Sequence, residues 1–307
     1  MSADYAEEGR QRRRSTRESG GYGGAAKELP REQRVDPQQK ADDLTVRTIS
    51  AVIYTMAIIA CLVLGPIPTG ILVAAMACMC AIEFFELMRT AGRMPYQVVG
   101  IAGSIAFPLA ALLPRQFLAL VAFAFVLLVG IWYVFTPRAN IFDVAVTVFG
   151  SVYTGLLFSS VVYIRCADPG FPGALLTFGV MGSVWLNDAT AYLVGTRFGQ
   201  HKMAPKISPK KSWEGFIAGM VGSIVAWVIL AALNVCGVTW AIAIPCALVV
   251  GCSGVLGDLF ESRIKRGVGV KDSGNLMPGH GGMLDRSASL LFATMAALAL
   301  LRAWGIV

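Results

Sequence analysis

Charged residues are scarce in this sequence, and their scarcity excludes most classes of soluble protein. Asp, Glu, Lys and Arg make up 15% of the 307 residues, against roughly 25% in a typical soluble domain. Hydrophobic residues make up 56%, and the mean hydropathy is +0.64. The apolar residues are spread along the chain instead of being gathered for one soluble core. The composition therefore predicts a membrane protein with several spans.

Several common sequence signals are also absent. The seven cysteines contain no Cys-x-x-Cys pair, so neither a zinc site nor a disulfide framework is indicated. Neither the Walker A pattern nor GxGxxG occurs, which argues against the common nucleotide-binding folds. No run alternates with a period of two residues, so a membrane β-barrel is not indicated either.

The chain begins with a polar segment, residues 1–43, that almost lacks aliphatic side chains. Such a segment buries too little apolar surface to offset its conformational entropy, so we expect a disordered, basic cytoplasmic tail. Its arginines either contact anionic lipid headgroups or stay solvated. The rest divides into N-terminal transmembrane helices over 44–172 and a second transmembrane region, 173–307, with polar loops at 197–213 and 258–286.

Nine apolar runs follow the tail, each close to the roughly 20 residues that cross about 30 Å of hydrocarbon as a helix. With the N-terminus in the cytoplasm, all of the 26 Lys and Arg residues except Arg115, Arg165 and Arg302 fall at the cytoplasmic side, as the positive-inside rule requires. The prediction is therefore an all-α, polytopic membrane protein with about nine transmembrane helices. We expect them at 46–64, 67–88, 97–113, 117–136, 142–164, 173–196, 214–233, 238–257 and 287–305.

Several carboxylates lie inside or at the ends of these runs, where each would cost roughly 2.5–3.5 kcal/mol at mid-membrane. Glu83 and Glu86 share one helix face, as residues three apart do, and either line a hydrated cavity or reach toward the headgroups. Asp188 lies beside Asn187 well inside a run, which favours a substrate or ion site over a buried Asp that bonds neighbouring helices. Among them are Glu83, Glu86, Asp188, Glu214 and Asp258.

The loop 197–213 is rich in lysine. Pro205 and Pro209 prevent a continuous helix there, and Ser212 is placed to cap the next helix, with Glu214 in its first turn. Clustered lysines beside hydroxyls and a helix N-terminus predict a phosphate site, although the positive-inside rule alone also accounts for lysines in this loop. The lysines are Lys202, Lys206, Lys210 and Lys211.

The densest polar stretch is 257–289. Asp258 ends the eighth run and Asp285 precedes the ninth, so a loop that leaves and re-enters the membrane at one face brings these carboxylates close together. Mg²⁺ is usually held by one or two carboxylates with waters and substrate phosphates, which makes Asp258 and Asp285 its candidate ligands, with a second cation as an option. Nearby glycines permit close approach of a phosphate and cations neutralise it; these are Gly279, Gly281, Gly282, Lys265, Arg266, Lys271 and Arg286.

His280 is one of two histidines in the chain and has three interpretations. It positions or contacts a phosphate, it transfers a proton, or it is structural. A phosphate that attacks as nucleophile is already largely ionised at neutral pH, so little base catalysis is needed.

Together these residues resemble the phosphatidate cytidylyltransferase family (CDP-diacylglycerol synthases), strongly over 185–289 and only by hydropathy before that. The family's C-terminal signature is matched at Ser262, Ile264, Lys265, Arg266, Lys271, Asp272, Pro278, His280, Gly281, Gly282, Asp285 and Arg286. Its upstream motifs are matched at Asn187, Asp188, Ser208, Pro209, Lys210, Lys211, Ser212, Glu214, Gly215, Gly257, Asp258, Leu259 and Glu261.

One position departs from the family pattern. The signature ends in Asp-Arg-hydrophobic-Asp, whereas this chain has Ala288 in place of the second Asp. The resemblance links that Asp to the metal, so Ser287, Ser289 or water would be its substitute here. A catalytically impaired relative that binds lipid or nucleotide is therefore one alternative. A transporter, which would also explain intramembrane acids beside basic loops, is another.

The resemblance implies transfer of CMP from CTP to phosphatidate, giving CDP-diacylglycerol and pyrophosphate; an ether-linked lipid phosphate is the nearest alternative substrate. The site would face the cytoplasm from the cell membrane, with membrane lipids and a second copy of the chain as partners and no nucleic acid. The implied catalytic residues are Asp258, Asp285, Asp188, Lys211 and His280. The implied substrate contacts are Asn187, Ser208, Lys210, Ser212, Glu214, Glu261, Ser262, Lys265, Arg266, Lys271, Asp272, Gly281, Gly282 and Arg286.

Overall fold

The computed structural model describes residues 37–274 and 281–307, with side chains from residue 48 onward. The chain divides into two units, Met1–Asp42 and Asp43–Val307. Only the start of one helix is described in the first unit, so the predicted basic tail lies almost entirely outside the described residues.

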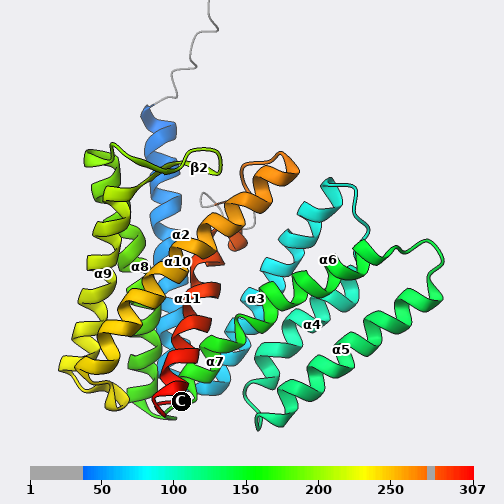
Figure 1. Ribbon diagram of the computed structural model, residues 1–307, viewed down its shortest axis with the longest axis horizontal. Helices are drawn as coiled ribbons and strands as arrows, with labels where there is room; N and C mark the ends of the chain where they lie inside the picture. The colour runs from blue at the N-terminus through cyan, green and yellow to red at the C-terminus, as the bar shows by residue number, and fades with distance from the viewer. Residues whose placement is uncertain (1–36, 275–280) are drawn as a thin grey trace, which may run out of the picture. The chain divides into compact units, whose positions relative to one another are not determined.

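Helices make up nearly all of the second unit (Figure 1). The nine predicted apolar runs all fall on helices, so the all-α prediction is confirmed, apart from one short hairpin formed by β1 (Lys202–Ala204) and β2 (Ser208–Ser212). The helical segments are α2 (Pro37–Leu64), α3 (Pro66–Thr90), α4 (Gln97–Ala110), α5 (Gln116–Phe135), α6 (Ile141–Ser151), the π-helical η1 (Val152–Leu156), α7 (Ser159–Arg165), α8 (Phe171–Phe198), α9 (Trp213–Ala232), the 3₁₀-helical η2 (Val235–Gly237), α10 (Trp240–Val268) and α11 (Met283–Ala303).

Within the described residues, six helical segments are long and apolar enough to cross a membrane. Three of the nine predicted spans are not among these six. The apolar part of α2 is only Thr48–Leu64, and α4 has only 14 residues. The third, α8, contains the polar pair Asn187 and Asp188. The chain is thus a multi-pass α-helical membrane protein. The six segments are Pro66–Thr90, Gln116–Phe135, Ile141–Arg165, Trp213–Ala232, Trp240–Val268 and Met283–Ala303.

Glycines on α9 allow α8 and α9 to pack closely. A Cβ on Gly219 would lie 2.5 Å from the Asn187 Oδ1 atom, and one on Gly222 would lie 2.8 Å from the Leu186 carbonyl oxygen. Only a hydrogen atom fits at these points, which is how small residues bring membrane helices together. The packing places the start of α9 beside the last turns of α8, where the hairpin joins them.

The helices that flank the densest polar stretch are longer than the hydropathy predicts. α10 continues to Val268 and α11 begins at Met283, so the predicted loop 258–286 is helical at both ends. Gly269 ends α10 with φ 82°, a left-handed conformation that favours glycine. The hairpin and the C-terminal end of α10 lie at one end of the second unit, and the C-terminus of the chain lies at the other (Figure 1).

Candidate functional site

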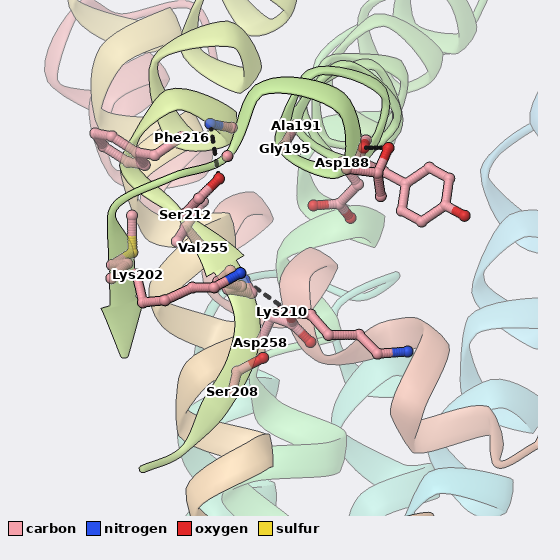
Figure 2. A pocket seen from close by; sticks show the side chains of 16 residues that line it. Asp188, Ala191, Gly195, Lys202, Ser208, Lys210, Ser212, Phe216, Val255 and Asp258 are labelled. Atoms are coloured by element: carbon pink, nitrogen blue, oxygen red, sulfur yellow. Dashed lines mark hydrogen bonds and ion pairs between the residues drawn. The ribbon is translucent and has the colours of Figure 1, made fainter. Parts of the chain in front are cut away.

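The polar residues of α8, the hairpin and α10 surround one cavity of about 540 Å³, a volume typical of small-molecule sites. Figure 2 shows the carboxylates of Asp188 and Asp258 reaching the same space from different helices. The hairpin closes the other side with lysine and serine side chains. The residues that line the cavity include Asp188, Tyr192, Lys202, Ser208, Lys210, Lys211, Ser212, Phe216 and Asp258.

Lys211 and Asp258 form an ion pair across this cavity, with 2.7 Å between Lys211 Nζ and Asp258 Oδ2. The two side chains are 22% and 34% exposed, so water screens the pair and its net contribution to stability is small. A phosphate that enters the cavity can therefore compete for the lysine at little cost. Asp188 lines the same cavity from α8.

The hairpin is anchored at its base by local bonds. Pro205 and Pro209 lie in or beside its strands, and Lys202 pairs with Ser212, which confirms that no helix continues here. Ser212 caps α9, accepting a hydrogen bond of 3.2 Å from the Gly215 N–H, and Glu214 lies in the first turn, as predicted. Glu214 also binds His201, with 2.6 Å between Oε1 and Nδ1, so in this structure it fixes the hairpin.

A second cluster lies between α10 and α11. Lys265 Nζ lies 2.8 Å from Glu261 Oε1 and 2.6 Å from Asp285 Oδ1. Asp285 also accepts hydrogen bonds from the backbone N–H groups of Ser273 and Gly282. Glu261 is only 2% exposed. Breaking such a buried set by removing one partner costs about 3–5 kcal/mol, because a charge is left unpaired.

The cavity and the buried cluster adjoin on α10, since Asp258 and Glu261 are three residues apart on one helix face. The predicted metal ligands Asp258 and Asp285 thus belong to neighbouring sets of contacts, one paired with Lys211 and the other with Lys265. Across residues 37–274 and 281–307, no group of three or more His, Cys, Asp or Glu side chains is arranged to hold a metal ion. Two carboxylates nevertheless suffice when substrate phosphates complete the shell of Mg²⁺.

The remaining predicted residues lie outside the cavity lining. The Asn187 side chain of α8 is 2% exposed and packs against Gly219 of α9 and Gly251 of α10. Its amide has no hydrogen-bond partner among the described atoms. Arg266 donates to the Val270 carbonyl oxygen at the end of α10. Ser262 is half-buried, and Lys271, Asp272 and Arg286 are exposed. Gly281 has φ 84°, and His280 lies outside the described residues.

Sequence reasoning left the roles of Glu83 and Glu86 open between cavity lining and a reach toward the headgroups. Glu86 is exposed, whereas Glu83 is buried. For Glu83 the structure shows neither, because its side chain is 1% exposed and accepts hydrogen bonds from the first residues of α11. The only local signal was a carboxylate in an apolar run.

The fold and the site define a polytopic helical membrane protein with a cavity of lysines and carboxylates beside a buried ion cluster. The model of the cytidylyltransferase family matches residues 45–304, and the chain belongs to this family.

Curated relatives bear a common name. The chain is 32% identical to the phosphatidate cytidylyltransferase of Bacillus subtilis (strain 168) over 261 residues, 81% of this chain and 94% of that protein. It is 31% identical to the protein of that name from Staphylococcus haemolyticus, over 81% and 95% of the two chains. The relative from Mycobacterium tuberculosis (strain H37Rv) is 39% identical over 171 residues, 53% of this chain and 48% of that protein. The resemblance drawn from the sequence motifs is thereby confirmed.

Proposed function

We propose that this protein transfers CMP from CTP to phosphatidate, forming CDP-diacylglycerol and releasing pyrophosphate. The observation that carries the proposal is the Lys211–Asp258 pair, which stands in a cavity with Lys202 and Lys210 at the end of apolar helices. Several cationic side chains are needed to neutralise a nucleoside triphosphate, and an apolar surface beside them is needed to hold the acyl chains of a diacyl lipid. The family and the names of its relatives support the same reaction.

In this reaction a phosphate oxygen of phosphatidate attacks the α-phosphorus of CTP, and the bond from that phosphorus to the bridging oxygen breaks. Pyrophosphate carries the electron pair away. The nucleophile is already largely ionised, so we assign positioning and charge stabilisation to the protein. Lys202, Lys210 and Lys211 neutralise phosphate charge in the cavity, and Ser208 and Ser212 supply hydroxyl groups beside them. Asp188 contributes a carboxylate to the cavity lining.

The residues present fit a magnesium ion that arrives with CTP. Asp258 offers a partly exposed carboxylate at the cavity, and Asp285, paired with Lys265, lies on the neighbouring helix. These two would hold Mg²⁺, or two cations, together with phosphate oxygens. When bound, the ion supplies charge neutralisation and polarises the phosphorus–oxygen bonds.

We further propose nine crossings, a cytoplasmic N-terminus and a site that faces the cytoplasm from the cell membrane. CTP is water-soluble, and the lysine hairpin lies at one end of the second unit with the C-terminus at the other (Figure 1). With nine crossings, an odd number, a cytoplasmic N-terminus implies a C-terminus on the opposite side of the membrane. The lysines of the hairpin follow the positive-inside rule in this orientation. A homodimer, implied by the family resemblance, stays a prediction.

Position 288 supports one alternative, a relative that binds lipid or nucleotide without turnover. Ala288 is fully buried between α10 and α11, where its carbonyl oxygen would lie 2.4 Å from a Cβ on Gly257. The family Asp is thus replaced by a packing residue. Nucleotide binding without product would favour this alternative.

Asp258→Ala tests the assigned site. The purified variant should lose Mg²⁺- and CTP-dependent product, because the cavity carboxylate is removed, while Glu86→Ala should keep it, because Glu86 is an exposed carboxylate on α3. Turnover by Asp258→Ala at the wild-type rate would sink the assignment.

A further inference from the structure

Glu83 lies on α3, more than a hundred residues before the family signature, yet its carboxylate is bonded to the loop and helix of that signature. Oε1 accepts from the Met283 N–H at 2.8 Å, and Oε2 accepts from the Leu284 N–H at 2.8 Å. Oε2 also accepts from the Ser273 hydroxyl at 3.1 Å. Two of these donors are the first N–H groups of α11, which have no partner within their own helix. A carboxylate at this end also interacts favourably with the helix dipole.

The chain makes room for this carboxylate with two glycines. A Cβ on Gly274 would lie 2.9 Å from Glu83 Cγ and 3.0 Å from Oε1. A Cβ on Gly282 would lie 2.6 Å from Oε2 and still closer to the Ser273 hydroxyl. The sequence predicted that glycines here admit a phosphate. In the structure Gly282 makes room for the side chain of Glu83, and its contact with a phosphate stays a prediction.

The residues around Glu83 are the same ones that hold Asp285. Ser273 donates its hydroxyl to Glu83 and its backbone N–H to Asp285, 3.1 Å from Oδ2. Gly282 donates its N–H to Asp285 at 3.2 Å and precedes the two residues bonded to Glu83. One buried carboxylate therefore bonds the side chain of Ser273 and the two residues that follow Gly282, next to the two N–H groups that bond Asp285.

We propose that Glu83 is a positioning residue for the transfer reaction: it locks Ser273 and the first turn of α11 and thereby sets the place of Asp285. This inference rests on the proposed function, because it assigns Asp285 to the phosphate and metal end of the site. It also gives the N-terminal helices a part in the site, since α3 belongs to them. Glu83 itself touches no substrate in this proposal.

Glu83→Gln is the sharpest perturbation, because it keeps the size of the side chain and removes one acceptor. The NH₂ group of the glutamine cannot accept a hydrogen bond. Whichever way the amide is turned, the bond from the Met283 N–H or the bond from the Leu284 N–H is therefore lost. We expect turnover to fall at least about tenfold, the size of effect that follows from a displaced catalytic group. The Mg²⁺ concentration for half-maximal rate should rise, while the KM for phosphatidate should change less than about twofold. Glu86→Gln, the same change one turn along α3 at an exposed position, should leave all three quantities unchanged.

Two further readouts separate positioning from mere folding. Hydrogen exchange should show faster exchange of the Met283 and Leu284 amides in Glu83→Gln, with α8 and α9 unaffected. The rise in melting temperature on adding Mg²⁺ and CTP should also shrink. Gly274→Ala should reproduce these effects by displacing the carboxylate, and in a Glu83→Ala background it should add little to the loss already present.

The outcomes distinguish this inference from the function on which it rests. A wild-type protein without CTP-dependent product overturns the proposed function. An active wild type together with Glu83→Gln that keeps its rate and its Mg²⁺ dependence overturns the role of Glu83. Equal loss of melting temperature and of protein yield, with unchanged Mg²⁺ dependence of the remaining activity, shows a structural role only and also overturns it.

Discussion

Replacing Lys211 separates two roles that its ion pair with Asp258 could serve. As a structural pair, the contact is screened by water, since the side chains are 22% and 34% exposed. Its loss should then cost stability of at most about 1 kcal/mol. As a phosphate ligand, Lys211 would supply a charge-assisted hydrogen bond of about 1.5–3 kcal/mol. Because about 1.4 kcal/mol corresponds to a factor of ten, Lys211→Ala should lower kcat/KM for CTP roughly 10- to 150-fold.

The assay compares Lys211→Ala with Lys206→Ala in purified protein, measuring initial rates against CTP and the melting temperature of each variant. Lys206 is an exposed lysine of the same hairpin that does not line the cavity, so its removal changes net charge equally. We expect Lys206→Ala to retain wild-type kcat/KM and Lys211→Arg to recover part of the lost rate. Equal effects of the two alanine variants would refute the reasoning, since only the general charge of the hairpin would then matter.

Two other predictions concern position 288 and orientation. Ala288→Asp should lower the melting temperature, because a carboxylate enters a fully buried position, and should lower the Mg²⁺ concentration for half-maximal rate; an unchanged Mg²⁺ requirement and rate would show that position 288 lies outside the metal shell. In a background whose seven free cysteines are replaced by serine, Lys206→Cys should react with a membrane-impermeant maleimide only in inside-out vesicles; labelling of this variant in intact cells would contradict the cytoplasmic location of the hairpin.

Hydropathy predicted the helices well because crossing a membrane demands an apolar run of fixed length, and all nine predicted runs are helical. It placed helix ends less well. The eighth run was expected to end at 257, where charged residues begin, yet α10 continues to Val268. The first charged residues mark the end of the membrane-spanning part, but the helix continues until its backbone hydrogen bonds are interrupted. Here that point is Gly269, a conformational signal that hydropathy does not contain.

Local chemistry predicted the Ser212 cap, which the structure confirms, because a cap depends on residues close in sequence. The phosphate site in the lysine loop stays a prediction. The hairpin was missed, since strands as short as Lys202–Ala204 carry little periodicity. Glu83 was left without a role for another reason. Its partners lie 190 to 201 residues away, and nothing local to α3 identifies them. The assignment of catalytic and substrate-binding roles stays a prediction.

The central claim is tested most directly by incubating the purified wild-type protein with radiolabelled CTP and phosphatidate, with and without Mg²⁺. The account predicts a labelled lipid that co-migrates with CDP-diacylglycerol, formed with one equivalent of pyrophosphate and only when the cation is present. Retention of CTP by the protein without any labelled lipid, across the range of Mg²⁺ concentrations, would contradict it.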